Sequence, residues 1–479
     1  MSAAASSAEL PGEEGGGGWR RVSLPTSINR HTLSVAAVLA AAFLNLLGFT
    51  MAGPITPALG AHFGLEVGAS LGWLTSAYPL GMLGGLVLWP ALSDRIGRKP
   101  VITLSLLGSG IGLATQGMAV RSGMSLTVFL ILRAITGSMA GASPVAKAYL
   151  ADVGAGAGQL PRYMSWRDAA STLAFIVGPL LSGSLYLGKQ AVGLGKQGSL
   201  AAVITTSGMY SLVAGLLVAL CVSETPPTPV QTPEATRGGS SSSSSKPKRG
   251  SPPAPPAAAA PPPATEDVLV ACPLGTQLVA AVTTVCIISA LFNAGSAPFD
   301  AFFPSLIKDV AGLDEGGIGK AKAALATLSL LVSATLSART QKRFGAVATC
   351  VAGLSASAIG LAALSAVVAY SEAAALSKSL TITLFWLAAA VYQLGVPLFG
   401  PTIPTMLLQC VPRQRRGAVM GLDSSLNTVA RIVSAPLLGA LYGVAGPAVC
   451  FGTASAVLFA SAATTVIRRV YVMRGLYQK

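Results

Sequence analysis

Twelve stretches of apolar residues, each close to the length of a membrane span, limit the folds that this chain can adopt. An α-helix needs roughly 20 apolar residues to cross the hydrocarbon core of a bilayer. Lipid offers the backbone no hydrogen bonds, so a spanning segment must satisfy its own. The stretches lie at 34–57, 69–89, 101–120, 126–150, 168–188, 201–222, 275–299, 323–338, 346–370, 380–409, 418–443 and 448–467. The sequence therefore predicts an all-α membrane protein with twelve transmembrane helices.

The low content of charged residues excludes several soluble classes. Charged residues are only 10% of the 479 residues, whereas soluble domains carry roughly a quarter. Such a chain cannot cover the surface of a cytosolic enzyme or a nucleic-acid-binding module. The six cysteines and two histidines lack the spacing of metal ligands, and no G-x-x-x-x-G-K-[ST] loop occurs. We expect no enzymatic activity, no metal and no cofactor, with coupling to protons left open.

A segment rich in Pro, Ser and Ala divides the chain between the sixth and seventh stretches. Such a composition cannot bury a core and predicts a disordered linker. The expected parts are an N-terminal tail at 1–32, a six-helix bundle at 33–222, the linker at 223–266, a second bundle at 267–468 and a C-terminal tail at 469–479.

Basic residues predict the orientation in the membrane. Most of the 32 Lys and Arg residues lie in the two tails, the linker and the short loops on the same side. The positive-inside rule then places both termini and the linker in the cytoplasm. The net charge of +15 therefore reflects topology and not a nucleic-acid partner. The plasma membrane, a vacuole and a plastid envelope are the alternatives for the membrane.

The two halves of the sequence resemble each other. A shift of 248 positions aligns four features of the first half with the second: Asn45 with Asn293, Gly64-Leu65 with Gly312-Leu313, Arg95 with Arg343, and Gly97 with Gly345. The run from Gly178 to Gly183 also resembles the run from Ala435 to Gly439. This repetition predicts two pseudo-symmetric bundles related by an axis along the membrane normal.

The loop after the second stretch carries a family motif. It reads PALSDRIGRKP and resembles the signature of the major facilitator superfamily at Asp94, Arg95, Gly97, Arg98 and Lys99, with Pro90 in place of the first glycine. The resemblance implies the major facilitator fold and secondary active transport by alternating access. In that family, a charge network at this loop controls which side of the membrane is open.

Further motifs resemble the tetracycline-exporter-like branch of twelve-helix drug:proton antiporters. They are AYLADV ending near Asp152, Gly178-Pro179 with Gly183, and the exit sequence Ser223-Glu224-Thr225. Arg133 with Gly137 resembles the R-x-x-x-G motif of the superfamily as a whole. The resemblance implies an exporter or antiporter, a gate of Asp94, Arg98 and Asp152, and a helix-packing motif at Gly178, Pro179 and Gly183. Asn45 replaces the acid that this branch carries on its first helix, so proton coupling there is not expected.

Ionisable residues inside the expected helices indicate the substrate site, because each costs about 2.5–3.5 kcal/mol to insert. The candidate cavity residues are Asn45, Arg133, Asn293, Asp300, Asn427 and Arg431. Arg431 either faces substrate or pairs with Asp300, and Asp300 itself lies either in the helix or just outside the membrane. Lys147 either adds to the cavity or reaches the headgroups.

Three cations (Arg133, Lys147 and Arg431) against one acid predict an electropositive cavity and an organic anion as substrate. The alternatives are a lipophilic or cationic drug exporter, a facilitative uniporter, and a non-transporting receptor or scaffold. The expected partners are a small-molecule substrate and the lipid bilayer, without nucleic acid, and the expected state is a monomer.

Overall fold

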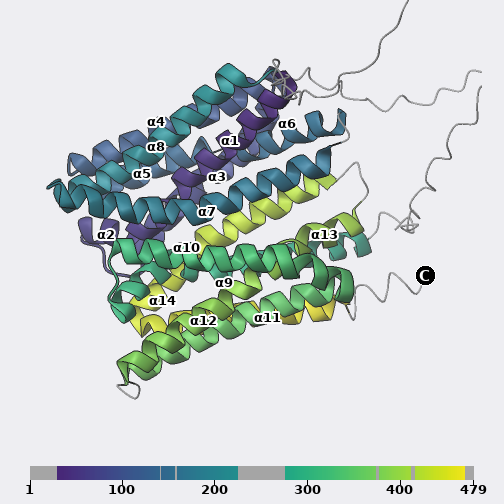
Figure 1. Ribbon diagram of the computed structural model, residues 1–479. Helices are drawn as coiled ribbons and strands as arrows, with labels where there is room; N and C mark the ends of the chain where they lie inside the picture. Colours follow the sequence, from purple (N-terminus) through teal and green to yellow (C-terminus); the bar gives the residue numbers. More distant parts are fainter. Residues whose placement is uncertain are drawn as a thin grey trace, which may run out of the picture.

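The computed structural model describes residues 30–140, 142–156, 159–224, 276–373, 377–411 and 416–469, and the described residues form helices joined by short turns (Figure 1). The first half contains α1 (Arg30–Thr50), α2 (Ala52–His62), α3 (Ala69–Ile96), α4 (Arg98–Arg121), α5 (Leu126–Ser138), α6 (Ala142–Gly156), α7 (Leu160–Ala191) and α8 (Gly195–Cys221). The second half contains α9 (Thr276–Ala311), α10 (Glu315–Val332), the π-helical turn η1 (Ser333–Ser337), α11 (Ala338–Glu372), α12 (Lys378–Phe399), α13 (Thr402–Cys410) and α14 (Arg416–Ile467). Both predicted tails and the predicted linker lie almost entirely outside the described residues.

These helices make twelve spans. Ten continuous segments of the described chain are long and apolar enough to cross a membrane. The two longest, Glu315–Glu372 and Val419–Ile467, each contain one glycine with positive φ, Gly345 at 82° and Gly446 at 86°. A left-handed residue breaks a helix, so each of these segments is two spans. The predicted twelve-helix architecture is therefore confirmed.

The internal repeat is visible in the backbone. Gly97 precedes α4 with φ of 99°, and its predicted counterpart Gly345 has φ of 82°. Gly64 and Gly312, which follow the first span of each half, have φ of 65° and 64°. Only glycine adopts these angles without strain. The two halves thus turn at equivalent positions.

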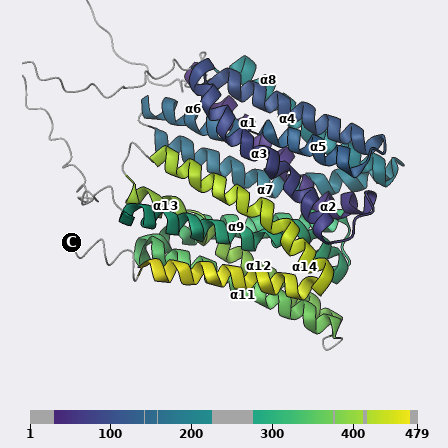
Figure 2. The ribbon, with the colours of Figure 1, turned by 180° about the vertical axis from the view of Figure 1, so that it is seen from behind.

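One end of the molecule, here called the terminal end, holds the start of α1, the end of α8, the start of α9 and the end of α14 (Figures 1 and 2). The halves approach each other most closely near the other end, here called the opposite end. There α3 packs on α14, where a Cβ on Gly72 would lie 2.5 Å from the carbonyl oxygen of Ala435. Likewise α7 packs on α10, where a Cβ on Gly319 would collide with the carbonyl oxygen of Pro179. Small residues permit this close approach of backbones.

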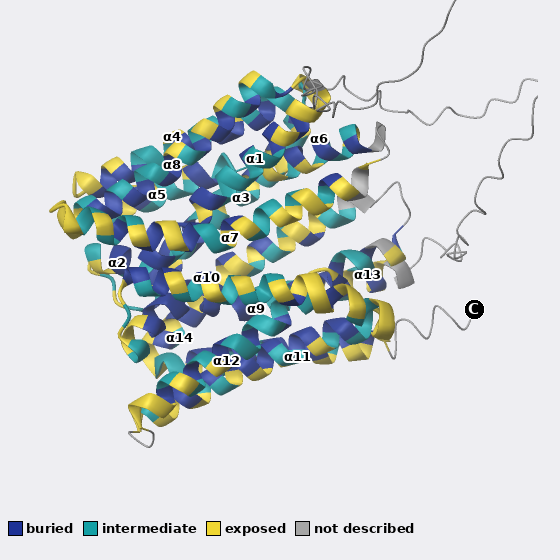
Figure 3. Cartoon of the chain, viewed as in Figure 1, coloured by how far each residue is buried: buried dark blue, intermediate teal, exposed yellow. Residues whose placement is uncertain are grey.

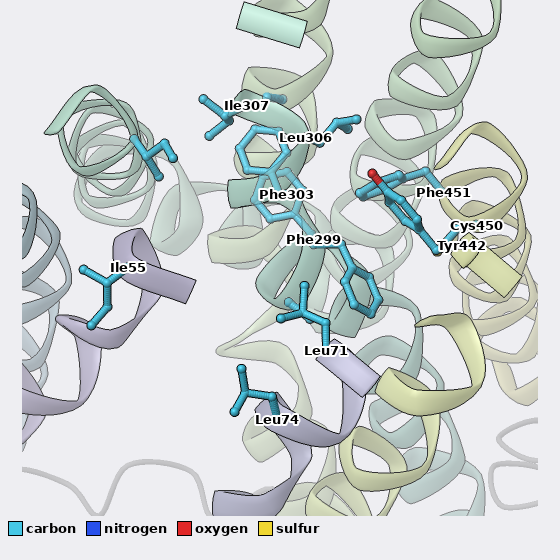
Figure 4. Close-up of a cluster of buried hydrophobic side chains, with 14 of the residues drawn as sticks. Ile55, Leu71, Leu74, Phe299, Phe303, Leu306, Ile307, Tyr442, Cys450 and Phe451 are labelled. Atoms are coloured by element: carbon cyan, nitrogen blue, oxygen red, sulfur yellow. The ribbon is translucent and has the colours of Figure 1, made fainter. Parts of the chain in front are cut away.

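Apolar side chains from both halves fill the interface at the opposite end. Ile55, Leu71 and Leu74 of the first half belong to the same buried cluster as Phe299 and Phe303 of the second (Figure 4). Exposed residues occur on many of the helices (Figure 3). Large apolar side chains are among them, for example Val87 and Leu220. A soluble protein would not expose so much apolar surface, whereas lipid accommodates it.

Candidate functional site

The charged residues of the predicted gate lie together at the terminal end. The Arg98 guanidinium donates to Asp94 Oδ1 over 2.8 Å and to Asp152 Oδ2 over 3.4 Å. It also donates to the hydroxyl of Ser93 over 2.7 Å. Arg98 thus joins α3, α4 and α6. Its pairs are partly or largely exposed, so they contribute little to stability and can exchange at low cost.

Glu224, which follows α8, completes this corner. Its carboxylate accepts the backbone N–H of Arg98 over 2.9 Å and that of Lys99 over 3.4 Å. A carboxylate at a helix N-terminus satisfies free N–H groups and complements the helix dipole. Gly97 leaves room for it, since a Cβ there would lie 2.6 Å from Glu224 Oε1. The exit sequence indicated the family branch, but its contact with α4 was not predicted.

The predicted helix-packing motif lies in α7. Gly178 faces Thr50 of α1 within the first half. Pro179 and Gly183 face α10 of the second half, where a Cβ on Gly183 would lie 2.7 Å from the carbonyl oxygen of Glu315. This motif therefore forms part of the contact that closes the opposite end.

An ion pair joins α9 and α14 between the two halves. Arg431 Nη2 lies 2.6 Å from Asp300 Oδ2, with side chains 43% and 55% exposed. Asp300 lies within α9, eleven residues before its end at Ala311, so it is not outside the helix. Of the two alternatives for Arg431, the structure shows the pair. Because both side chains are half exposed, other polar groups can reach them.

The stretch predicted at 323–338 leaves Lys322 outside the span, on the side opposite the termini, whereas the structure places it within a helix. Helix α10 begins at Glu315, which places Lys322 seven residues inside it. A Cβ on Gly53 of α2 would lie 2.9 Å from the Lys322 ammonium nitrogen, and the same ammonium is within electrostatic range of Asp300. Lys320 and Lys322 lower the local hydropathy, which delayed the expected start of the helix to 323.

Arg133 lies in a different place from Arg431. It lines a cavity of about 30 Å³ inside the first half, together with Gln116 and Ser207. Its Nε is buried without a hydrogen-bond partner, and its guanidinium carbon lies 5.9 Å from the ring centroid of Phe129. A cavity of this volume holds one or two water molecules and no organic substrate. Arg431 is not among the residues that line this cavity.

The predicted asparagines make local contacts. Asn45 Oδ1 accepts from the Ser211 hydroxyl of α8 over 3.4 Å. Asn293 Nδ2 donates to the carbonyl of Ser289 one turn earlier. Asn427 Nδ2 donates to Asp423 Oδ2 over 3.0 Å.

The predicted balance of three cations against one acid was incomplete. Among the described residues, five cations and three acids lie about two turns or more inside helical spans. They are Arg133, Lys147, Arg167, Lys322, Arg431, Asp168, Asp300 and Asp423. Asp423 and Asp168 lie within the predicted stretches and could have been found by reading those stretches for charges. The cationic excess of two is the same as the predicted one.

Lys147, Arg167 and Asp168 form a group nearer the terminal end. Arg167 donates to Asp168 over 3.3 Å and to the hydroxyl of Ser143 over 2.9 Å. Lys147 lies within electrostatic range of both. The 75% exposed carboxylate of Asp168 shows that the group borders open space.

Sequence comparisons match known transporters over part of the chain. The family model described as Major Facilitator Superfamily matches residues 38–377. The major facilitator-type transporter psiT2 of Psilocybe cyanescens is 33% identical over 122 residues, which are 25% of this chain and 22% of that protein. The multidrug resistance protein MdtG of Yersinia enterocolitica is 31% identical over 175 residues, 34% of this chain and 39% of that protein. The alignments thus span well under half of these relatives.

Solved structures match over nearly the whole chain. A D-xylose-proton symporter superposes with a TM-score of 0.67 at 16% identity, covering 91% of this chain and 96% of that one. The human organic anion transporter MFSD10 (TETRAN) superposes with a TM-score of 0.58 at 18% identity, covering 91% and 99%. These likenesses establish the fold. Because the family model matches well over half of the sequence, this multi-pass membrane protein belongs to the Major Facilitator Superfamily.

Proposed function

We propose that the protein is a secondary active transporter that exports or exchanges a small molecule by alternating access. Two equivalent halves meet tightly at the opposite end through Gly72, Pro179 and Gly319. The half-exposed pair of Arg431 and Asp300 lies between the ends of its helices. We interpret this arrangement as the state closed at the opposite end and open toward the terminal end. By the positive-inside rule, the terminal end faces the cytoplasm.

The ion-pair site between the halves is the proposed substrate site, and an organic anion is the proposed substrate. The single observation that carries this is that Arg431 is paired with Asp300 while a second cation, Lys322, lies within electrostatic range of the same acid. A cation left without a full partner in a low-dielectric region costs free energy, which an arriving carboxylate would lower. An anion would therefore compete with Asp300 for Arg431 and Lys322. MFSD10, which has the same fold, is described as an organic anion transporter.

Flux into reconstituted vesicles tests the proposal. Labelled organic anions and cations of similar size are offered to the wild type and to Arg431→Gln, Lys322→Gln and Arg133→Gln. Anion uptake should fall about tenfold or more in the first two variants, which corresponds to one lost interaction of about 1.4 kcal/mol. Lys320→Gln is the matched control, because Lys320 is exposed on the same helix. Unchanged anion flux in the Arg431 and Lys322 variants would contradict an anion site.

Export of lipophilic or cationic drugs is the second candidate. It is favoured by the names of two relatives, the multidrug resistance protein MdtG of Yersinia enterocolitica and the multidrug transporter mfsB of Aspergillus fumigatus. In that case the wild type would move the cations, and Asp300→Asn would lower their flux more than Arg431→Gln does.

A further inference from the structure

A buried carboxylate on α14 takes no part in the proposed substrate site. Asp423 lies seven residues after the start of α14 at the terminal end and is only 7% exposed. Helix α9 packs against this part of α14, with Cys286 near enough to interact electrostatically with the carboxylate. Neighbouring positions, Val419 and Met420 among them, pack into a cluster of apolar side chains. Burying a charge among such groups is costly unless something neutralises it.

No cation neutralises Asp423 among the side chains that the structure describes. Its polar neighbours are the amide of Asn427, at 3.0 Å, and the hydroxyl of Ser289. Arg431, two turns further along α14, is bonded to Asp300. Arg468, near the end of α14, donates instead to the sulfur atoms of Met406 and Cys410.

The other elements packed against α14 offer little charge to this position. The titratable group from α9 is Cys286, and the one from α13 is Cys410. Cys350 of α11 faces Thr465 on the last span instead. The close approach of α3 to α14, at Gly72, lies near the opposite end. Within the described part of the chain, ion pairing therefore does not account for Asp423.

Two oxygen atoms at this position have no hydrogen-bond partner among the described side chains. Asp423 Oδ1 and Asn427 Oδ1 are both buried and unbonded. A carboxylate oxygen and an amide oxygen can only accept hydrogen bonds, and buried acceptors without a donor are costly. A proton added to the carboxylate would remove the charge and supply a donor. Residues 423 and 427 lie one helical turn apart, so Asp423 Oδ1 and Asn427 Oδ1 are on the same face of α14.

We propose that Asp423 is a proton-binding site within the membrane-spanning part of the protein. A proton from water at the terminal end forms an O–H bond with the carboxylate and later leaves as a proton, with no oxidation or reduction. That this proton is coupled to net anion transport through the Arg431–Asp300 site, and not to anion-for-anion exchange, rests on the proposed transport function, whereas proton binding itself does not. Asp423 would then do the work of the acidic residue that the resembling antiporters carry on the first span, where this chain has Asn45.

A proton fits this position better than a metal ion. Hard cations such as Ca²⁺ take about six or more oxygen ligands. The described side chains at Asp423 supply a carboxylate, one amide and one hydroxyl. Protonation needs only the carboxylate and one acceptor.

Infrared difference spectroscopy of the full-length protein in lipid vesicles tests proton binding without any substrate. Spectra recorded between about pH 5 and about pH 8 should show a protonated carboxylic acid that loses its proton as the pH rises. Asp423→Asn should lack this band, and Asp423→Glu should restore it at a shifted frequency. Asp168→Asn is the matched control, because its carboxylate is 75% exposed and its removal should leave the band unchanged.

An identical band in the wild type and Asp423→Asn would overturn the proposal. So would a band that changes when sodium chloride replaces choline chloride at constant pH, because the site would then bind a metal cation. Coupling is measured separately, with the dye pyranine trapped in vesicles and the anion that the wild type transports. Asp423→Asn should retain anion exchange and lose anion-driven proton flux. If proton flux in Asp423→Asn equals that of the wild type, another group couples proton movement to anion transport.

Discussion

The ammonium nitrogen of Lys322 on α10 lies 2.9 Å from the position that a Cβ on Gly53 of α2 would take, so a cation of the second half lies beside a helix of the first half. Neither residue is near the end of its span, since Gly53 lies within His31–His62 and Lys322 within Glu315–Glu372. Separation of the halves would therefore change the surroundings of Lys322. This contact connects the proposed substrate site with the motion of the two bundles.

Enlarging Gly53 should weaken substrate binding. In Gly53→Val the side chain would displace the Lys322 ammonium, which is the flexible end of its side chain, so the fold should persist. We expect KM for an organic anion to rise roughly fivefold, equivalent to about 1 kcal/mol. Gly84→Val is the control, because a Cβ at Gly84 meets nothing within 4 Å. The effect should vanish in a Lys322→Gln background, since coupled residues are not additive. An undiminished effect in that background would rule out the Lys322 contact as its cause.

Adding one methyl group at Gly319 should weaken closure of the opposite end. Its Cβ would collide with the carbonyl oxygen of Pro179, which is a backbone atom and not the flexible end of a side chain. Overpacking of this kind costs about 1–3 kcal/mol, and that cost falls on the closed arrangement. In an Ile55→Cys background, the rate of labelling by a water-soluble thiol reagent should rise about fivefold or more, because Ile55 lies in the interface (Figure 4).

Gly188→Ala provides the comparison on the partner helix α7. A Cβ at Gly188 meets nothing within 4 Å, so its labelling rate should equal that of the parent. Equal rates in all three proteins would show that Gly319 does not control closure.

The twelve spans could be predicted because they depend on local apolar sequence. The residues of the proposed gate came from the family resemblance, since Asp152 lies 54 positions from Arg98. Asp94 and Arg98 are four residues apart and meet through that spacing alone. The pair of Arg431 and Asp300 spans 131 positions, and only the packing of α9 on α14 brings it together. Lys322 and Asp423 were missed for a different reason. The expected spans were defined by their apolar residues. Lys322 was therefore left just outside the stretch at 323–338, and Asp423 was overlooked inside the stretch at 418–443.

Neutralising Asp94 should stop transport without unfolding the protein. The Asp94 side chain is 67% exposed, so its pair with Arg98 contributes no more than about 1 kcal/mol to stability. Loss of the charge would free Arg98 to turn toward Asp152 alone and would unbalance the network between the two access states. We expect Asp94→Asn to lower flux about tenfold or more. Asp94→Glu, which keeps the charge, should recover much of it. Wild-type flux in Asp94→Asn would contradict a gating role.

The proposed linker should be replaceable, provided that its first two residues stay. Ser223 N–H donates to the Ser34 hydroxyl over 2.9 Å, and Glu224 accepts from the start of α4. Both are thus bonded to the first half. A Gly/Ser chain of equal length from 225 to 266 should leave flux unchanged, because a flexible chain spans adjacent bundles whatever its sequence. Glu224→Gln is the contrasting variant, because it should change the protein where the Gly/Ser replacement does not. It removes the charge that stabilises the N-terminus of α4, at a cost of about 0.3–1 kcal/mol, which should appear as a lower Tm in detergent. A loss of substrate affinity in the Gly/Ser chimera, with Glu224 intact, would show that the segment does more than connect the two halves.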